Sequence, residues 1–111
     1  MEYTLKIYET LSGSEPLSEW LSGLRDQKAR IAIRMRLDRM KLGNFGYCES
    51  VGEGVSEMKI DLGPGYRVYF GMIKRTIVLL LCGGDKGSQD KDIRRALSYF
   101  RDHKQREKND A

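Results

Sequence analysis

The sequence predicts an α+β fold with the element order β-α-α-β-β-β-α, and three observations lead to this prediction. Apolar residues alternate with a period of two, then recur at helical spacing over two segments, and then alternate again over three consecutive segments. Short turns join those three segments, so the strands must run antiparallel. A last segment returns to helical spacing. We therefore expect a four-stranded, largely antiparallel sheet with a helical hairpin and a C-terminal helix packed around it.

The N-terminal residues predict the first strand and the first helix. Apolar side chains alternate with others over residues 3–8, which is typical of a half-buried strand. Pro16 suits the first turn of a helix, where its missing N–H leaves no hydrogen bond unmade. The residues after it place a single apolar stripe on that helix, with members Leu17, Trp20, Leu21 and Leu24.

A second helix is expected from about Arg25 to Leu42, completing a hairpin over residues 15–42. Its apolar stripe consists of Ala29, Ile33, Leu37 and Met40, and Gly43 is a typical helix stop. Ile31 and Met35 lie on the opposite side, so we expect this helix to be contacted from two directions. The segment carries seven Lys or Arg and only two Asp, within a chain of net charge +4. Such an excess attracts polyanions, although a solvated helix face produces the same pattern.

Three strands are expected after a loop over residues 43–54. The first covers Ser56–Leu62 and the second covers Tyr66–Ile73. Between them, the Gly63-Pro64-Gly65 turn leaves both glycines free to take a positive φ. The third, Thr76–Cys82, is apolar on both sides, which is typical of a central strand.

The C-terminal segment predicts one more helix and a frayed tail. Gly83 and Gly84 are expected to end the last strand, and Ser88 is expected to cap a helix with the stripe Ile93, Ala96, Leu97 and Phe100. Residues 105–111 contain no apolar residue before Ala111, so we expect them to fray. No repeat or linker divides the chain, and residues 1–104 are expected to form one domain.

Composition argues against several classes of protein. The chain is 40% hydrophobic and 32% charged, and its longest uncharged apolar stretch is far shorter than the ~20 residues that span a bilayer. Cys48 and Cys82 have neither CxxC spacing nor a nearby histidine, which argues against a zinc site and a disulfide scaffold. The one histidine, His103, lies in the charged C-terminal segment and is a poor general base. We expect a cytoplasmic protein without a secretory signal, membrane contact, metal or small-molecule cofactor.

One polar face of the predicted sheet holds candidate functional residues. Alternation places Glu57, Lys59, Arg67 and Tyr69 away from the core, on two strands that the turn makes neighbours. Lys59 and Arg67 repel each other unless a carboxylate or an anion lies between them. Two interpretations are open: a carboxylate such as Glu57 or Asp61 forms an ordinary surface ion pair, or a phosphodiester binds there.

The glycine-rich turn over residues 83–88 is a weaker candidate. It lacks the spacing of a phosphate-binding loop, although a capped helix start beside Lys86 can hold an anion. The alternative is that its glycines only permit a tight turn.

Two runs of sequence resemble a known toxin family. GVSEMKIDLGPGYRVYF, residues 54–70, and IVLLLCGGDKGSQDKDI, residues 77–93, are similar to the phage-derived HigB-like addiction module killer proteins, a branch of the RelE/ParE toxin superfamily. The similarity extends over nearly the whole chain, including the helical hairpin. It implies a RelE-like fold and a toxin of a type II toxin–antitoxin pair. Characterised relatives of this type cleave messenger RNA in the ribosomal decoding site.

The resemblance also implies which residues would act on RNA. Arg67 in YRVYF matches the arginine that RelE-type toxins place at the scissile phosphate, and Lys59 matches the basic residue of the preceding strand. Lys86 takes the place of a further basic residue. Glu57 stands where RelE has a second lysine, and it is a candidate general base. No tyrosine follows Lys86 at the position where RelE uses one.

Three further residues are candidates for contact with RNA. Tyr69 is expected beside Arg67, where it would stack on a nucleotide or form a hydrogen bond with it. Arg34 and Lys41 belong to the basic segment.

The function expected from this resemblance is a metal-independent, ribosome-dependent endoribonuclease that inhibits translation. The alternative is a binding toxin on the same fold, which either poisons DNA gyrase as ParE does or only binds its antitoxin. The expected partners are messenger RNA on the ribosome and a helix-turn-helix, HigA-like antitoxin. Acidic or apolar segments of that antitoxin would cover the basic second helix.

Overall fold

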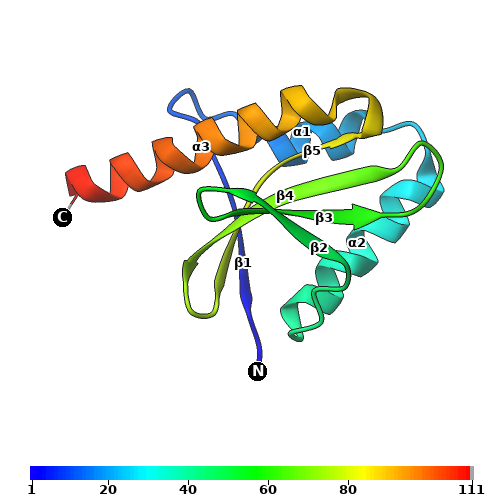
Figure 1. Ribbon diagram of the computed structural model, residues 1–111, viewed down its shortest axis with the longest axis horizontal. Coiled ribbons are helices and arrows are strands. Elements are labelled where there is room, and N and C mark those ends of the chain that lie inside the picture. Colours follow the sequence, from blue (N-terminus) through cyan, green and yellow to red (C-terminus); the bar gives the residue numbers. More distant parts are fainter. Residues whose placement is uncertain (111) are drawn as a thin grey trace.

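A computed structural model describes residues 1–110 as an α+β fold around a five-stranded mixed sheet, which confirms the predicted class. The elements in chain order are β1 (Thr4–Ile7), α1 (Pro16–Gly23), α2 (Gln27–Lys41), β2 (Cys48–Gly52), β3 (Val55–Ile60), β4 (Tyr66–Lys74), β5 (Ile77–Asp85), the 3-10 turn η1 (Lys86–Ser88) and α3 (Gln89–Asp110). Across the sheet the strands follow the order β1-β5-β4-β3-β2 (Figure 1).

The strand pairing confirms the predicted meander and adds a parallel edge. β3 pairs with β4, and β4 with β5, in antiparallel register. The turn between β3 and β4 has the expected positive φ at Gly63 (56°) and Gly65 (82°). β1 instead runs parallel to β5, with Thr4 opposite Ile77. A parallel neighbour needs a long crossover connection, and the segment that contains α1 and α2 belongs to it.

The prediction of four strands is wrong by one, because β2 lies inside the segment expected to be a loop. Its sequence, CESVG, contains polar residues and a glycine and has no apolar alternation. β2 is an edge strand that pairs only with β3, with Glu49 opposite Glu57. Backbone pairing therefore forms this strand without a buried side-chain pattern, and hydrophobic periodicity cannot detect it.

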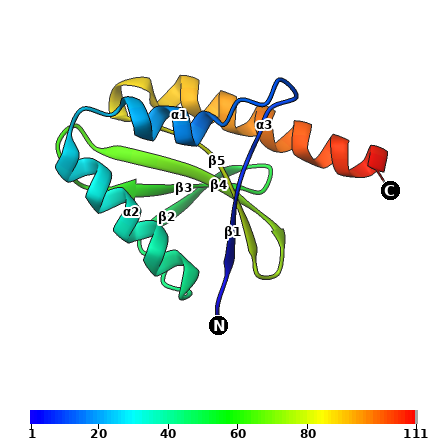
Figure 2. The same ribbon diagram turned by 180° about the vertical axis from the view of Figure 1, so that it is seen from behind.

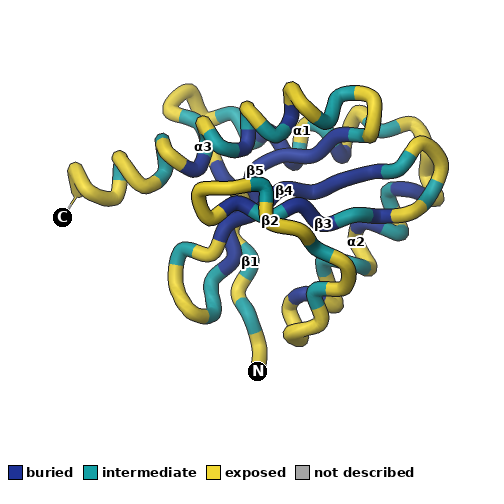
Figure 3. The backbone as a smooth tube through the Cα atoms, in the orientation of Figure 1, coloured by how far each residue is buried: buried dark blue, intermediate teal, exposed yellow. Residues whose placement is uncertain are grey.

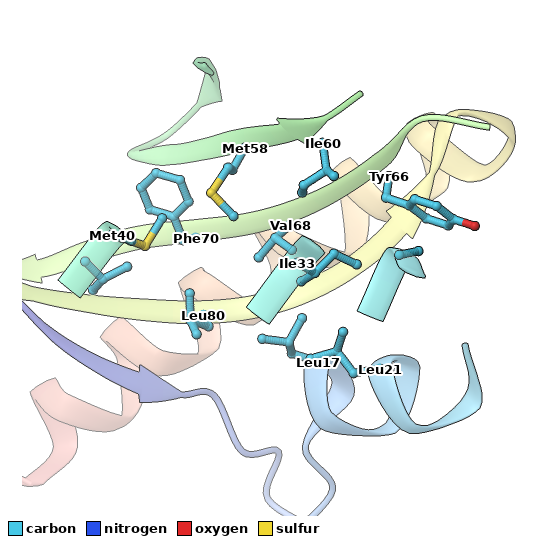
Figure 4. Packing of buried hydrophobic residues seen from close by; sticks show 12 residues of the cluster. Leu17, Leu21, Ile33, Met40, Met58, Ile60, Tyr66, Val68, Phe70 and Leu80 are labelled. Atoms are coloured by element: carbon cyan, nitrogen blue, oxygen red, sulfur yellow. The ribbon is translucent and has the colours of Figure 1, made fainter. Parts of the chain in front are cut away.

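The helical hairpin packs on one face of the sheet, as predicted. Both helices lie against the sheet (Figure 2), and their buried stripe residues contact apolar side chains of β3, β4 and β5 (Figure 4). The expected second contact surface of α2 is not covered within the described chain, since Ile31 is 60% exposed and Met35 is 49% exposed.

The C-terminal helix covers the opposite face of the sheet. Ala96 and Phe100 of α3 pack against Tyr69 of β4 and Leu81 of β5. Because helices lie on both faces, β4 and β5 are buried over most of their length (Figure 3). The central strand predicted from its double-sided apolar sequence is confirmed, and β4 proves to be buried on both faces as well.

Gly83 and Gly84 do not end β5, contrary to the prediction, because the strand continues to Asp85. A Cβ at Gly83 would overlap the Trp20 ring, and one at Gly84 would overlap the Asp92 carboxylate. These glycines therefore permit close approach of side chains from both layers. The cap is also different: the Asp85 carboxylate, and not Ser88, accepts hydrogen bonds from the Gly87 and Ser88 N–H groups, at 2.8 and 3.2 Å.

The predicted frayed tail is helical as far as Asp110, and Ala111 lies outside the described residues. Charged pairs replace the missing apolar stripe. The Asp102 carboxylate accepts hydrogen bonds from the Tyr8 hydroxyl (2.5 Å) and from Arg106 one helical turn later (2.6 Å). Arg106 also donates to the Glu9 carbonyl at 2.6 Å. These bonds tie the end of α3 to the segment after β1.

Tyr8→Phe is expected to lower the free energy of unfolding by about 1.5 kcal/mol or more, since the lost hydrogen bond has a charged acceptor. Burial, and then the bond to Asp102, raises the pKa of Tyr8 to about 12, and the same bond first lowers the pKa of Asp102. The Asp102 contribution is present above its ordinary pKa and is lost as pH falls through the lowered value. The Tyr8 contribution is present below pH ~10 and is lost as pH rises towards 12.

Thermal melts of Tyr8→Phe and wild type across pH measure this contribution. Their difference should be largest from about pH 5 to 9 and should shrink on either side. Tyr99→Phe is the control: it removes an α3 hydroxyl that accepts a hydrogen bond from Arg95, whose side chain is 42% exposed, so its loss should be smaller. Equal losses in the two variants would contradict the assignment.

Candidate functional site

A cleft of about 310 Å³ lies beside the β3–β4 turn and collects several basic residues. We refer to it as the basic cleft. Strands β3 and β4 and their turn supply most of its lining, α2 supplies one arginine, and the loop before β2 supplies a tyrosine. The lining residues are Arg36, Tyr47, Lys59, Ile60, Asp61, Gly65, Tyr66 and Arg67.

Arg67 is held at one end of the cleft by the strands around it. Its backbone lies opposite Lys59 on β3, and its side chain is 11% exposed. Nη1 donates to the Gly65 carbonyl at 3.2 Å, and Nε lies 3.5 Å from the Glu57 carboxylate without forming a hydrogen bond. Nη2 forms no hydrogen bond within residues 1–110, and unlike Nε it is not buried. A guanidinium held in this way can donate to an anion that enters the cleft.

The Glu57 carboxylate is buried beneath Arg67. Its side chain is 1% exposed, and it accepts hydrogen bonds from the Tyr69 hydroxyl (2.8 Å) and the Gln89 amide (3.0 and 3.3 Å). Burial, together with the bond to Glu57, raises the pKa of Tyr69 far above its ordinary value, so the hydroxyl remains a donor. Glu57 thus has no solvent-facing oxygen for a general base, and its contacts instead fix Arg67.

The prediction that Glu57 and Tyr69 lie on an exposed polar face is wrong, because both side chains are buried. Because η1 and α3 cover it, Glu57 and Tyr69 face other side chains and not solvent. Tyr69 is 0% exposed, so it cannot stack on a nucleotide in this structure. For Glu57, the ion-pair interpretation left open by the sequence is the one that the structure supports.

Lys59 lies at the rim of the cleft, where its charge is partly compensated. Nζ is 3.3 Å from the Glu49 carboxylate and 4.0 Å from that of Glu57, and the side chain is 28% exposed. It also lies 5.2 Å from the centre of the Tyr47 ring, a cation–π distance. Hydrogen bonds from Tyr47 and then from Lys59 lower the pKa of Glu49. Sequence patterns did not indicate Tyr47 or Glu49, because they belong to the segment expected to be a loop.

Lys86 adjoins the same end of the cleft. Its N–H donates to the Gly65 carbonyl at 2.9 Å, the same oxygen that accepts from Arg67. The Lys86 side chain is exposed. The neighbouring helix start does not offer free N–H groups to an anion, because the Asp85 carboxylate already accepts from Gly87 and Ser88. The turn therefore places Lys86 beside Arg67 without forming an anion site of its own.

Arg34 and Lys41, the remaining predicted RNA contacts, are not brought to the basic cleft. They line a separate groove between α2 and β1, where Lys41 lies 3.6 Å from Asp38. Arg36 takes their place, and its guanidinium donates to the carbonyls of Lys59 (2.7 Å) and Phe45 (3.4 Å). The inward position of Arg36 could have been predicted from its spacing, because it follows Ile33 by three residues and so lies on the buried stripe of α2.

The chemistry available in the cleft is that of cations and hydrogen-bond donors. Among residues 1–110, no group of three or more His, Cys, Asp or Glu side chains lies close enough together to hold a metal ion. Burial raises the pKa of Cys82 to about 12, so its thiol stays protonated at neutral pH. In the described chain, no helix has the length and apolar character needed to cross a membrane. The cations and hydrogen-bond donors that line the basic cleft favour an anionic ligand at Arg67.

Fold and cleft together define a small α+β protein in which a buried carboxylate lies beside an arginine of a basic cleft. The chain belongs to the same family as an uncharacterized protein of Haemophilus influenzae. The two are 45% identical over 93 residues, which cover 84% of this chain and 90% of that protein. No family model matches the sequence.

Proposed function

We propose that the protein is the toxin of a type II toxin–antitoxin pair, with a RelE-like fold, and that it cleaves messenger RNA on the ribosome in the cytoplasm. The observation that carries the proposal is that three basic residues lie around the β3–β4 turn. The Arg67 guanidinium and the Lys86 backbone N–H both donate to the Gly65 carbonyl, and Lys59 lies opposite Arg67. The resemblance of residues 54–70 and 77–93 to HigB-like proteins supports it independently.

The proposed reaction uses the 2′-hydroxyl of RNA as the nucleophile. Its oxygen bonds to the adjacent phosphorus, the bond from phosphorus to the 5′-oxygen breaks, and the products are a 2′,3′-cyclic phosphate and a 5′-hydroxyl. The 2′-hydroxyl loses its proton to solvent or a basic group, and the leaving oxygen gains one. Arg67 neutralises the charge that builds on the phosphoryl oxygens, and Lys86 and Lys59 add positive charge nearby. The ribosome supplies the alignment of the message.

A specific observation favours a second candidate, a toxin of the same fold that binds its target without cleaving it. Both oxygens of Glu57 are engaged in hydrogen bonds, so no buried carboxylate is free to accept the proton of the 2′-hydroxyl. A ParE-like action on DNA gyrase or an action through the antitoxin alone needs no such group.

Primer extension on a reporter message, after controlled expression in a bacterium, tests the two candidates. A nuclease produces new 5′ ends that depend on translation of the message. A protein that inhibits growth without these ends, while binding its antitoxin normally, supports the second candidate. Inhibition of purified gyrase would identify the ParE-like form.

The outer face of α2 is the proposed contact surface for the antitoxin. Exposed Ile31 and Met35 lie there among the basic residues of the helix, so an acidic segment with apolar side chains would complement it. Ile31→Glu is expected to weaken antitoxin binding by at least about 10-fold, because it places a carboxylate in an apolar contact that excludes water. Isothermal titration with the purified antitoxin measures the change.

Leu11→Glu is the matched control for this prediction. Leu11 is 82% exposed and lies in the segment between β1 and α1, which Figures 1 and 2 show away from α2, so the same substitution there should leave the affinity unchanged. Full affinity of Ile31→Glu would place the antitoxin elsewhere on the protein.

A further inference from the structure

We infer that the basic cleft is a nucleobase site that selects guanine next to the phosphate bound by Arg67. This inference rests on the proposed function, since it concerns one base of the RNA substrate. Three features of the cleft carry it: its size and apolar wall, an exposed aromatic ring, and a carboxylate without a partner.

The dimensions and wall of the cleft suit one flat ring system. Its volume of about 310 Å³ lies at the small end of the range for ligand sites, roughly 300–1,000 Å³. Ile60 and Tyr66, which are 4% and 6% exposed, line it together with the charged residues. Arg67 is another lining residue, so a base in the cleft would sit beside a phosphate at its guanidinium.

Tyr47 offers a stacking surface for that base. The residue is 59% exposed, and its hydroxyl forms a hydrogen bond with the Glu49 carboxylate. This bond is the largest cause that raises the pKa of Tyr47, so the phenol stays neutral. Exposed aromatic rings beside cationic residues are a common means of holding single-stranded RNA, because every base has a face that can stack.

Asp61 provides the selectivity. It immediately follows β3, it is exposed, and its carboxylate forms no hydrogen bond or ion pair within the described chain although Arg36, Lys59 and Arg67 line the same cleft. A carboxylate only accepts hydrogen bonds, and its two oxygens match two parallel N–H donors. Guanine presents two such donors, N1–H and the N2 amino group, on its Watson–Crick edge. Adenine and cytosine present one amino group there, and uracil presents one imino N–H.

The test is single-turnover cleavage on ribosomes programmed with messages that differ at one nucleotide. Each position flanking the scissile bond carries guanine, inosine, which lacks the N2 amino group, or uracil. At one of these positions the wild-type protein should cleave the guanine message roughly 5- to 100-fold faster than the uracil message, the range expected for one bidentate contact. The inosine message should fall between them.

Variants of the two cleft residues complete the test. Asp61→Asn should remove the difference between guanine and uracil, whereas Asp38→Asn, which removes the same charge from an exposed position on α2, should retain it. Tyr47→Ala should slow cleavage of all three messages, and Tyr47→Phe, which keeps the ring, should slow it less than Tyr47→Ala does. Thermal melts should show that all four variants fold.

The outcomes separate this inference from the proposed function. Cleavage that does not depend on the base at any flanking position, or a guanine preference that survives Asp61→Asn, would overturn the guanine site and leave the nuclease proposal intact. A wild-type protein that cleaves none of the messages would overturn the proposed nuclease, and the guanine site with it.

Discussion

Arg67→Ala is expected to slow cleavage of ribosome-bound message by on the order of 100-fold or more, because the phosphorane loses a fork of charged donors. The variant should also be less stable by about 1–3 kcal/mol, since Glu57 stays buried with one cation fewer beside it. Single-turnover cleavage measured well below the melting temperature, together with a thermal melt, separates the two effects. Alternation places Arg67 away from the core, where its loss would cost little stability, and its burial in the structure is the reason that a loss is expected.

Conservative and neighbouring variants show which property of Arg67 matters. Arg67→Lys keeps the charge and loses the planar fork, so its rate should fall between those of wild type and Arg67→Ala. Lys59→Ala and Lys86→Ala should lose less activity than Arg67→Ala, since each lysine contributes a point charge. Glu57→Gln turns an amide towards two donors, Tyr69 and Gln89, and should lower the melting temperature as well as the rate. Cleavage by Arg67→Ala at the parental rate would show that the proposed site is wrong.

Phe100→Ala is expected to cost the protein about 3–5 kcal/mol of unfolding free energy, the largest loss we predict for a single residue. Phe100 is 5% exposed and packs α3 against Gly71 of β4 and against Gly54 in the turn between β2 and β3. Neither glycine has a side chain that could fill the space left by the ring, so a cavity remains between the layers. Urea unfolding of the variant and of wild type measures the difference.

A double-mutant cycle with Gly71 controls this prediction. A Cβ at Gly71 would lie 2.7 Å from two atoms of the Phe100 ring, so Gly71→Ala alone should destabilise the protein by about 1–3 kcal/mol. In the Phe100→Ala background, the same substitution enters an empty space and should be neutral or stabilising. Additive losses would show that the ring does not pack against Gly71.

Local patterns were enough to predict most of the elements. The apolar stripes of α1 and α2 and the start of α3 depend on spacings of three and four residues, and the structure confirms them. The two glycines around Pro64 predicted a tight reversal, which places Lys59 opposite Arg67. Residues within a few positions of one another determine each of these features.

The candidate site was predictable only in part. Arg67, Lys59 and Lys86 were predicted from motif and alternation, and the structure brings them together at the turn. Alternation correctly put Glu57 and Tyr69 on the sheet face opposite the one that α1 and α2 cover. Alternation did not show that α3 covers that face. Because of this cover, Glu57 is not available as a general base and Tyr69 is not available to stack on a nucleotide.

The sequence by itself therefore determined the α+β class, the helical hairpin, the antiparallel meander and the identity of the basic residues near the turn. Only the tertiary structure decided the parallel pairing of β1 with β5, the addition of β2, the full length of α3 and the burial of Glu57. These features arise from contacts between distant residues, such as the Tyr8–Asp102 and Glu57–Gln89 hydrogen bonds. An apolar or polar pattern records how a residue relates to its neighbours along the chain, and it does not record which distant element covers it.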